Sequence, residues 1–280
     1  MATDTPFDFK TAIAARYGQA SGLPDAPNAN DLLASMLARG SCRAFADKPV
    51  ATELLNLLCA AAFAAPTKSD LQQRDVILLK DPNLRQQLAD LVSGQEWVAG
   101  APMIAVFCGN NRRQRLIHDW RDIPFANDHL DAFFNATADA AIALGAFVTA
   151  AEVMGLGCCP ISAVRNKSSE VSELLSLPQH VFPLAGLAIG YPNDPPQVSM
   201  RLPLEVTCHT DRYREDNLRE AVGGYDRARA ANQPYAKQRF AQHFGSRKDY
   251  GWSEDKARQY SHPERADFGA FVRAKGFSLD

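Results

Sequence analysis

Two arginines, Arg39 and Arg43, lie four residues apart with Ser41 between them in the segment Arg-Gly-Ser-Cys-Arg. A guanidinium group offers a planar fork of N–H donors and serine adds a hydroxyl, a set that matches the oxygens of a phosphate. The same arginines follow an expected short helix, residues 32–38, whose C-terminal dipole favours cations. The segment therefore indicates either an anion site or an electrostatically favourable helix end.

A second group of polar side chains lies in the loop Pro66-Thr67-Lys68-Ser69, which interrupts an otherwise apolar region with short hydroxyl and amide groups. The residue types that usually act as acids, bases, nucleophiles or metal ligands are scattered. No cysteines have C-x-x-C spacing, and no Cys/His cluster has zinc spacing. We therefore name no catalytic side chain and no metal ligand.

The six cysteines indicate a reducing compartment, the cytoplasm. Cys158 and Cys159 are adjacent, but neighbouring side chains on a strand point to opposite faces, so a disulfide between them is not expected. The net charge of −2 and the absence of a basic stripe make nucleic acid a poor partner. Residues 1–10 contain two aspartates and no apolar run, so they do not resemble a leader.

The element that must position these groups is the stretch Asp131–Met154, which is rich in alanine, lacks proline and should be a long helix. Its apolar residues go nearly all the way round, which is typical of a helix buried on most sides. Its polar residues make a membrane span a poor interpretation. Small residues at 140, 141, 143 and 145 would let a second helix approach, so the helix is either the centre of one core or also a dimer interface.

Four apolar runs predict strands, at residues 74–80, 102–108, 157–162 and 181–190. The run at 102–108 should be a central strand, because it is apolar without interruption. Residues 110–128 are charged and should be exposed. Further helices are expected at 53–64, capped by Thr52, at 82–91, at 168–175, capped by Ser168, and at 211–231 and 263–274. We divide the chain into an N-terminal extension (1–30), a core (31–208) and a C-terminal helical arm (209–280).

Four pieces of sequence, taken in order, resemble the nitroreductase family of FMN-dependent enzymes. They are Arg-Gly-Ser-Cys-Arg-Ala-Phe at 39–45, Ala-Pro-Thr-Lys-Ser at 65–69 followed by Leu-Gln at 71–72, Gly-Leu-Gly-Cys-Cys-Pro-Ile-Ser at 155–162, and Leu-Pro-Gln-His at 177–180 with Leu-Ala-Ile-Gly-Tyr-Pro at 187–192. Ser-Gly-Gln-Glu-Trp-Val at 93–98, Arg-Leu-Pro at 201–203 and the long arm are similar to the larger, NADPH-preferring, oxygen-insensitive members. The resemblance implies an α+β fold, with a mixed sheet wrapped by helices around a long central one. It also implies an intertwined homodimer with FMN at the interface.

The resemblance also assigns cofactor-binding residues. Arg39, Ser41 and Arg43 would hold the FMN phosphate, the ribityl chain and the pyrimidine edge, and Arg201 would be a second phosphate cation. The other implied contacts are Pro66, Thr67 and Ser69 from the partner subunit, Gln95 beside the pyrimidine, and backbone N–H groups of the turn Pro160-Ile161-Ser162-Ala163 at flavin O4 and N5.

Three positions depart from the family pattern. Gly40 stands where an arginine is common, Ser162-Ala163 where close relatives often have two glycines, and Ser199 where they often carry a phosphate-binding lysine. The last change removes one cation, which Arg165 or Lys167 would have to replace.

The activity implied is transfer of a hydride from NADPH or NADH through flavin N5 to a nitroaromatic or a quinone, with ping-pong kinetics and no catalytic side chain. A basic segment, Lys237-Gln-Arg239 with Ser246-Arg247-Lys248, either reads the 2′-phosphate of NADPH or is a solvated arm. Two other interpretations of the function stay open. One is a reductive dehalogenase or flavin-modifying member of the same fold, and the other is a flavin-free structural or binding homodimer.

Overall fold

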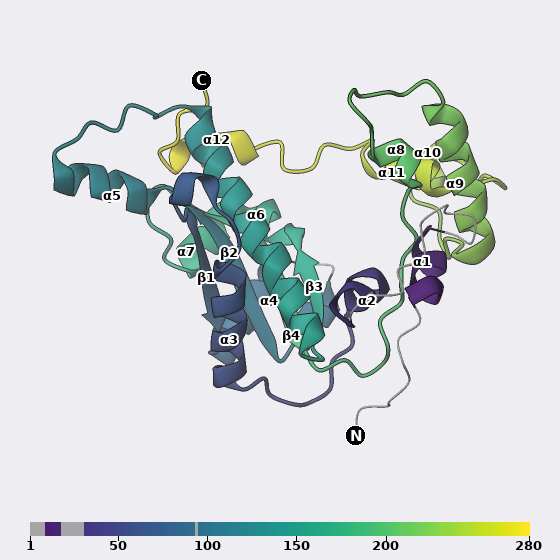
Figure 1. Ribbon diagram of the computed structural model, residues 1–280, viewed down its shortest axis with the longest axis horizontal. Helices are drawn as coiled ribbons and strands as arrows, with labels where there is room; N and C mark the ends of the chain where they lie inside the picture. Colours follow the sequence, from purple (N-terminus) through teal and green to yellow (C-terminus); the bar gives the residue numbers. More distant parts are fainter. Residues whose placement is uncertain (1–8, 18–30, 93–94) are drawn as a thin grey trace. The chain divides into compact units, whose positions relative to one another are not determined.

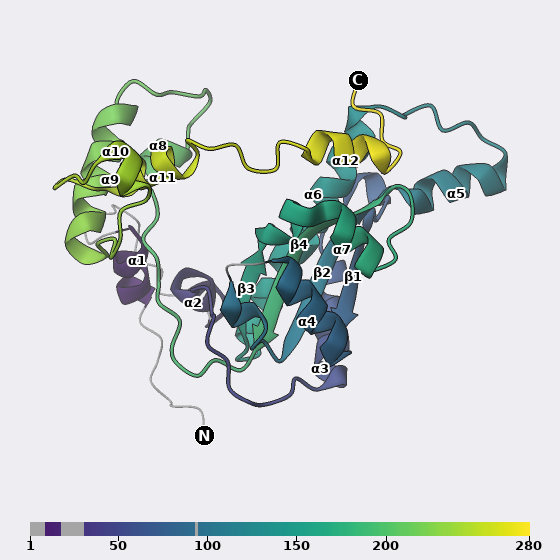
Figure 2. The same ribbon diagram turned by 180° about the vertical axis from the view of Figure 1, so that it is seen from behind.

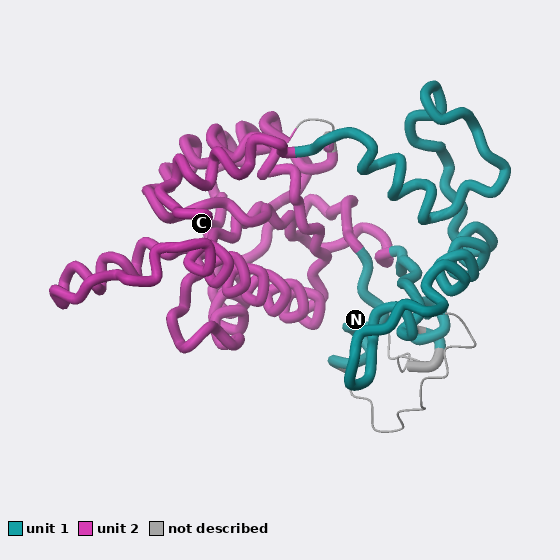
Figure 3. The backbone as a smooth tube through the Cα atoms, turned by 90° about the horizontal axis from the view of Figure 1, so that it is seen from above, with its two compact units in different colours: residues 1–40, 197–264 teal, residues 41–196, 265–280 magenta. Residues whose placement is uncertain are grey.

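In the computed structural model, residues 9–17, 31–92 and 95–280 are described. The chain divides into two compact units, which we describe separately (Figure 3). The smaller contains residues 1–40 and 197–264, and the larger contains residues 41–196 and 265–280. The three-part division expected from the sequence stays a prediction.

The larger unit is built on four strands, β1 (Arg74–Leu79), β2 (Met103–Asn110), β3 (Gly157–Ile161) and β4 (Val181–Gly190). All four were predicted within two residues at each end, because their apolar runs end at turn-forming residues. The strand order is β1-β2-β4-β3, and β2 and β4 lie at the centre.

The expected mixed sheet is not found among these strands, since every neighbouring pair is antiparallel. Strands β2 and β3 do run in the same direction, because the long helix between them returns the chain along the sheet. Strand β4 lies between them and pairs antiparallel with both. Strands β2 and β3 are therefore parallel in direction, but they are not hydrogen-bonded to each other.

Helices cover both faces of the sheet (Figures 1 and 2). Helices α3 (Thr52–Phe63) and α6 (Leu130–Val153) pack on one face, and α4 (Pro82–Leu91), the 3₁₀ helix η3 (Ser162–Lys167) and α7 (Ser168–Leu174) lie on the other. Successive residues of β2 point into the two layers: Phe107 lies in the core with α3 and α6, and Val106 in the core with α4 and α7. Burial on both faces is why the sequence of this strand is apolar without interruption.

The predicted long central helix is confirmed as α6, but in the single chain it buries one side only. Ala136, Ala143 and Phe147 are fully buried, and the Phe147 ring meets that of Phe107 edge-on with centroids 5.6 Å apart. Phe134 is 63% exposed and Ile142 43%. By length and hydropathy α6 would also pass as a membrane span, yet it packs along the sheet and α3 as a core helix does.

The rest of the larger unit lies around this layered body. Helix α5 (Arg112–Arg121) extends away from the sheet, as expected for a charged segment (Figure 1). Helix α12 (Phe268–Ala274) returns to it, and Phe271 and Phe277 form a third apolar cluster with residues of α6 and β4.

The described part of the smaller unit consists of helices and their connections, and the predicted start of one helix is wrong. Its elements are α1 (Phe9–Tyr17), α2 (Asp31–Ala38), α8 (Leu204–Thr207), α9 (Leu218–Asn232), α10 (Ala241–Phe244) and α11 (Trp252–Gln259). The helix expected from Asp211 begins only at Leu218, and Asp211 itself is excluded by its left-handed backbone (φ 62). In the larger unit, the helix expected from residue 263 begins at Phe268, after a left-handed Arg265 (φ 56).

The predictions that Thr52 and Ser168 cap their helices are also wrong. Thr52 and Ser168 are the first residues of their helices, and Ala51 and Lys167 occupy the cap positions without a side-chain hydrogen bond. The Ser168 hydroxyl donates to the carbonyl of Arg165 instead.

The C-terminal segment is held to the sheet through His180, which precedes β4. Its backbone N–H donates to the carbonyl of Lys275 (2.8 Å), and its Nε2 lies 2.8 Å from the carbonyl oxygen of Gly276. Burial of the imidazole, and then the nearby Arg115 cation, lowers the pKa of His180 below 6.5. The folded state therefore favours the neutral ring.

This shift predicts a loss of stability in acid. A folded-state pKa below the unfolded value means that the unfolded chain takes up the proton first as the pH falls through about 6.5. The contribution of His180 is thus present above that pH and is lost below it. We expect the Tm to fall between about pH 8 and about pH 5, and to fall less in His180→Asn, since asparagine tolerates the left-handed backbone here (φ 61). An equal decrease in both proteins would contradict this role.

Candidate functional site

The segment that carries Ser41 and Arg43 is fixed to the edge strand β3. The backbone N–H of Cys42 donates to the carbonyl of Cys158 at 3.0 Å. Gly157 makes room for this approach, because a Cβ at that position would lie 2.6 Å from the Cβ of Cys42. Cys42 is buried by the contact, and the side chains of Ser41 and Arg43 on either side of it remain exposed. Both are therefore available to a ligand at this sheet edge.

The same segment continues along the end of β4, where the N–H of Ala46 donates to the carbonyl of Tyr191 (2.8 Å). The guanidinium carbon of Arg43 lies 5.7 Å from the ring centroid of Trp97. Trp97 belongs to the 3₁₀ helix η2 (Glu96–Val98), which Gln95 precedes. The fold thus brings Arg43 beside the predicted Gln95 segment, whereas Ser93 and Gly94 of that motif lie outside the described residues.

The end of β3 and the start of η3 alternate between exposed and buried side chains. Pro160 and Ser162 are exposed, while Ile161 and Ala163 are 1% and 7% exposed and pack in the core. Ile161 and Ala163 can therefore offer a ligand only their backbone. Pro160 has no N–H, so it cannot be one of the expected donors. The remaining donors come at the start of η3, where N–H groups of a first turn have no partner within the helix.

Arg165, one of the two residues expected to replace the missing phosphate cation, is already hydrogen-bonded within the protein. One of its guanidinium N–H groups donates to the carbonyl of Leu184 in β4. The side chain thereby holds η3 to the sheet. Lys167 is exposed, and no ion pair involving it is seen among the described residues.

In the smaller unit, a residue that the sequence analysis overlooked ties together Arg39 and Arg201. Arg16 of α1 is 4% exposed, and its guanidinium donates to the carbonyls of Arg39 and Ser199. Its own carbonyl accepts the N–H of Arg201 at 2.9 Å. The backbones of both predicted phosphate cations are thus bonded to one residue, that of Arg39 to the Arg16 side chain and that of Arg201 to the Arg16 carbonyl. The only sequence signal was an arginine on the short helix of the extension.

The loop with Pro66, Thr67 and Ser69 is held near the middle of α6. The N–H of Lys68, which begins the 3₁₀ helix η1 (Lys68–Asp70), donates to the buried carboxylate of Asp139 (2.9 Å). Asp139 and Val153 are separated by 14 residues of helix, which is about 21 Å along its axis. The Arg43 segment is joined to the strand that follows the far end of that helix. One chain therefore holds the loop near the middle of α6 and the Arg43 segment beyond its C-terminal end.

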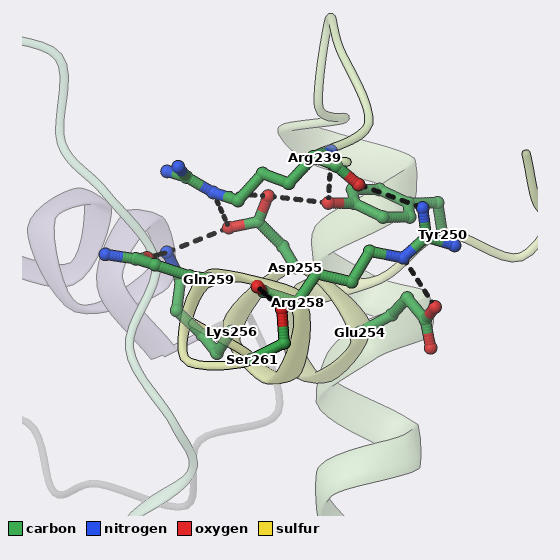
Figure 4. Close-up of polar contacts among 8 residues, drawn as sticks. All are labelled: Arg239, Tyr250, Glu254, Asp255, Lys256, Arg258, Gln259 and Ser261. Carbon is green, nitrogen blue, oxygen red and sulfur yellow. Dashed lines mark hydrogen bonds and ion pairs between the residues drawn. The ribbon is translucent and has the colours of Figure 1, made fainter. Parts of the chain in front are cut away.

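The predicted basic segment is partly neutralised. In Figure 4, Arg239 points to the buried carboxylate of Asp255, and its Nε lies 3.2 Å from Oδ1. Arg247 pairs with Glu254 at 3.4 Å. Burial opposes ionisation of Asp255, but hydrogen bonds from Lys256, Tyr250 and Arg239 outweigh it, so the pKa of Asp255 is lowered. The carboxylates of Asp255 and Glu254 thus hold this segment through its arginine side chains.

Comparison with known proteins identifies the group to which this fold belongs. The family model described as Nitroreductase family matches residues 36–191, and that of its C-terminal domain matches residues 199–280. The chain belongs to the nitroreductase family.

Individual nitroreductase relatives match most of the chain. An FMN reductase [NAD(P)H] of Bacillus subtilis is 37% identical over 200 residues, which are 70% of this chain and 80% of the relative. An oxygen-insensitive NADPH nitroreductase of Salmonella typhimurium is 37% identical over 174 residues, 62% and 71% of the two chains. The solved structure of B. megaterium NfrA2 superposes with a TM-score of 0.82 at 29% identity, covering 90% of this chain and all of the other. The family resemblance drawn from the sequence motifs is confirmed.

The contact between Gly157 and Cys42 can be tested directly. Gly157→Ala should lower the free energy of unfolding by about 1–3 kcal/mol, because the added methyl group overlaps Cys42. Adding Cys42→Gly should restore part of the loss. Urea unfolding of the two single variants and the double variant gives the coupling. If the two losses simply add, the residues do not constrain each other.

Proposed function

We propose that the chain is an FMN-dependent NAD(P)H oxidoreductase that reduces nitroaromatics, quinones or both by two-electron transfer. The observation that carries this is the position of the Arg43 segment, fixed to the sheet edge beside η2 in a chain of the nitroreductase family. Relatives named FMN reductase and NADPH nitroreductase support the cofactor and the reductant.

The donor groups assigned to the site are of the types that a flavin mononucleotide needs. Arg39, Arg43 and Arg201 are assigned to the phosphate, because a guanidinium group offers a cationic N–H fork to a dianion, and Ser41 would add a hydroxyl. Gln95 is assigned to the pyrimidine edge, and its amide can both donate to a flavin carbonyl and accept from a ring N–H.

When bound, FMN supplies the chemistry by accepting a hydride from the nicotinamide and passing two electrons to the acceptor. The protein's part is placement. Backbone N–H groups of Ile161, Ser162 and Ala163 would donate to the O4 and N5 side of the ring, where negative charge develops on reduction. No side chain is assigned as a general acid, since water can supply protons. If reductant and acceptor use the same face in turn, the kinetics should be ping-pong.

We also propose that the site forms between two copies of the chain. Within one chain the Pro66–Ser69 loop is held near the middle of α6 and the Arg43 segment beyond its C-terminal end, so the loop is assigned to a second copy. Helix α6 supports this pairing, since Phe134, Ala141 and Ile142 are exposed on it. An apolar face of this kind is typical of homodimer interfaces. Free thiols at all six cysteines agree with a cytoplasmic location.

The purified protein should be yellow, with an FMN spectrum that anaerobic NADPH bleaches and that a nitroaromatic or a quinone restores. A halophenol and free flavin complete the panel, because they report the dehalogenase and flavin-modifying alternatives. A colourless protein that FMN cannot reconstitute would instead support a flavin-free homodimer.

Arg43→Ala and Arg201→Ala should each raise the Kd for FMN about tenfold to a hundredfold, because a charge-assisted hydrogen bond is worth about 1.5–3 kcal/mol. Arg219→Ala, an exposed arginine of α9, is the matched control and should leave the Kd unchanged. Fluorescence titration of the apoprotein with FMN measures all three. Equal Kd values in the two variants and the control would remove both arginines from the site.

Ala141→Arg should convert the homodimer to monomers, because a charge buried in an apolar interface is costly unless it is paired. Sedimentation velocity measures the change. Asn83→Arg, on the exposed side of α4, adds the same charge elsewhere and should remain dimeric. A dimer that persists in Ala141→Arg would place the interface on another surface.

A further inference from the structure

The loop that carries Pro66, Thr67 and Ser69 has an unusual backbone. Ser69, Asp70 and Gln72 all have positive φ, at 48°, 56° and 50°. Residues other than glycine adopt this conformation at a cost, and they keep it only where surrounding contacts impose it. The exposed side chains of Lys68, Ser69 and Asp70 bury little apolar surface that would impose it. The contacts responsible must therefore reach the loop's main chain.

One of these contacts is the carboxylate of Asp139, which projects from α6 and is 1% exposed. Its Oδ1 accepts the N–H of Lys68 and its Oδ2 accepts the N–H of Gln73, both at 2.9 Å. The two donors enclose the left-handed residues, so this single side chain fixes both ends of the turn. A buried carboxylate is costly unless its oxygens are hydrogen-bonded, which makes the pairing strict.

The second contact is the guanidinium group of Arg74, which is 5% exposed at the start of β1. It donates to the carbonyls of Phe63 (2.6 Å), Ala65 (2.9 Å) and Pro66 (3.0 Å). The Phe63 carbonyl is at the end of α3, where helix geometry leaves it without an intrahelical partner, and the carbonyls of Ala65 and Pro66 belong to the loop that follows. Arg74 thus fixes the loop's entry, and Asp139 fixes the turn that follows.

We propose that Asp139 and Arg74 are positioning residues for the cofactor, acting through this loop on an FMN bound by a second copy of the chain. The proposal rests on the proposed function, which assigns Pro66, Thr67 and Ser69 to that contact. The Asp139 carboxylate accepts hydrogen bonds from two backbone N–H groups. The Arg74 guanidinium donates hydrogen bonds to three backbone carbonyls. Together they preset the loop before the cofactor binds, so that less ordering is required on binding.

Asp139→Asn tests the carboxylate with little change in shape. An amide has one acceptor oxygen and one NH₂ group, so one of the two backbone N–H groups must lose its partner. We expect the Kd for FMN to rise about tenfold in the dimeric apoprotein. We also expect faster amide hydrogen exchange, in protein without FMN, confined to residues 67–73. A Kd within twofold of the wild-type value would overturn the proposal.

A general loss of stability must be separated from this effect. Leu88→Ala, at a fully buried position of α4 on the other face of the sheet, should lower the Tm without loosening the loop. Its Kd for FMN should stay within twofold of wild type. A tenfold rise in Leu88→Ala as well would mean that the Kd reports stability alone, and would count against a positioning role.

Arg74 provides an independent test if Asp139→Asn does not fold. Arg74→Met should raise the Kd for FMN, and Arg74→Lys should recover part of the loss, since a lysine keeps the charge but not the fork. Equal Kd values in both variants and wild type would overturn the proposal. If the wild-type protein itself fails to bind FMN, the proposed function fails, and the hydrogen-exchange comparison still shows whether Asp139 holds the loop.

Discussion

Burial of strand β2 on both faces is the constraint from which the larger unit follows. Its residues contribute alternately to two apolar cores, so helices must cover both sides of the sheet. Strand β4 shares this position at the centre, and the edges are left to β1 and β3. The edge strand β3 is the place where a further segment can add by backbone hydrogen bonds, and Cys42 does so. The segment with Ser41 and Arg43 therefore lies at the β3 edge of the sheet.

Irregular segments cannot satisfy their own backbone groups, and buried charged side chains supply the missing partners here. Arg16 joins the carbonyls of the segments that contain Arg39 and Ser199. Arg74 and Asp139 hold the carbonyls and the N–H groups of one loop. Each of these side chains is costly to bury and becomes favourable only through several hydrogen bonds at once. Their positions are accordingly fixed by the fold around them, and they fix in turn the backbone of these irregular segments.

Helix α6 holds the loop through Asp139 near its middle and leads at its C-terminal end to β3, where the Cys42 segment is bonded. Its buried face packs on the sheet and includes Asp139, and its other face exposes large apolar side chains such as Phe134. A helix that is apolar on all sides in sequence but covered on one side in space needs a second surface. The homodimer we propose would provide that surface. It would also explain why the loop and the Arg43 segment are separated along the helix within one chain.

The sequence alone determined the strands, the long helix and the family. Uninterrupted apolar runs such as 103–108 have few alternative structures, and the motifs around Arg43 and Pro160 are short and ordered. Only the tertiary structure decided the antiparallel pairing of every strand, the late start of α9 after Asp211, and the roles of Arg16, Arg74 and Asp139. Strand order and buried polar contacts join residues far apart in the chain, as Asp139 does with Lys68 and Gln73. A local pattern of residue types records that a side chain is polar, but not which distant backbone group it will meet.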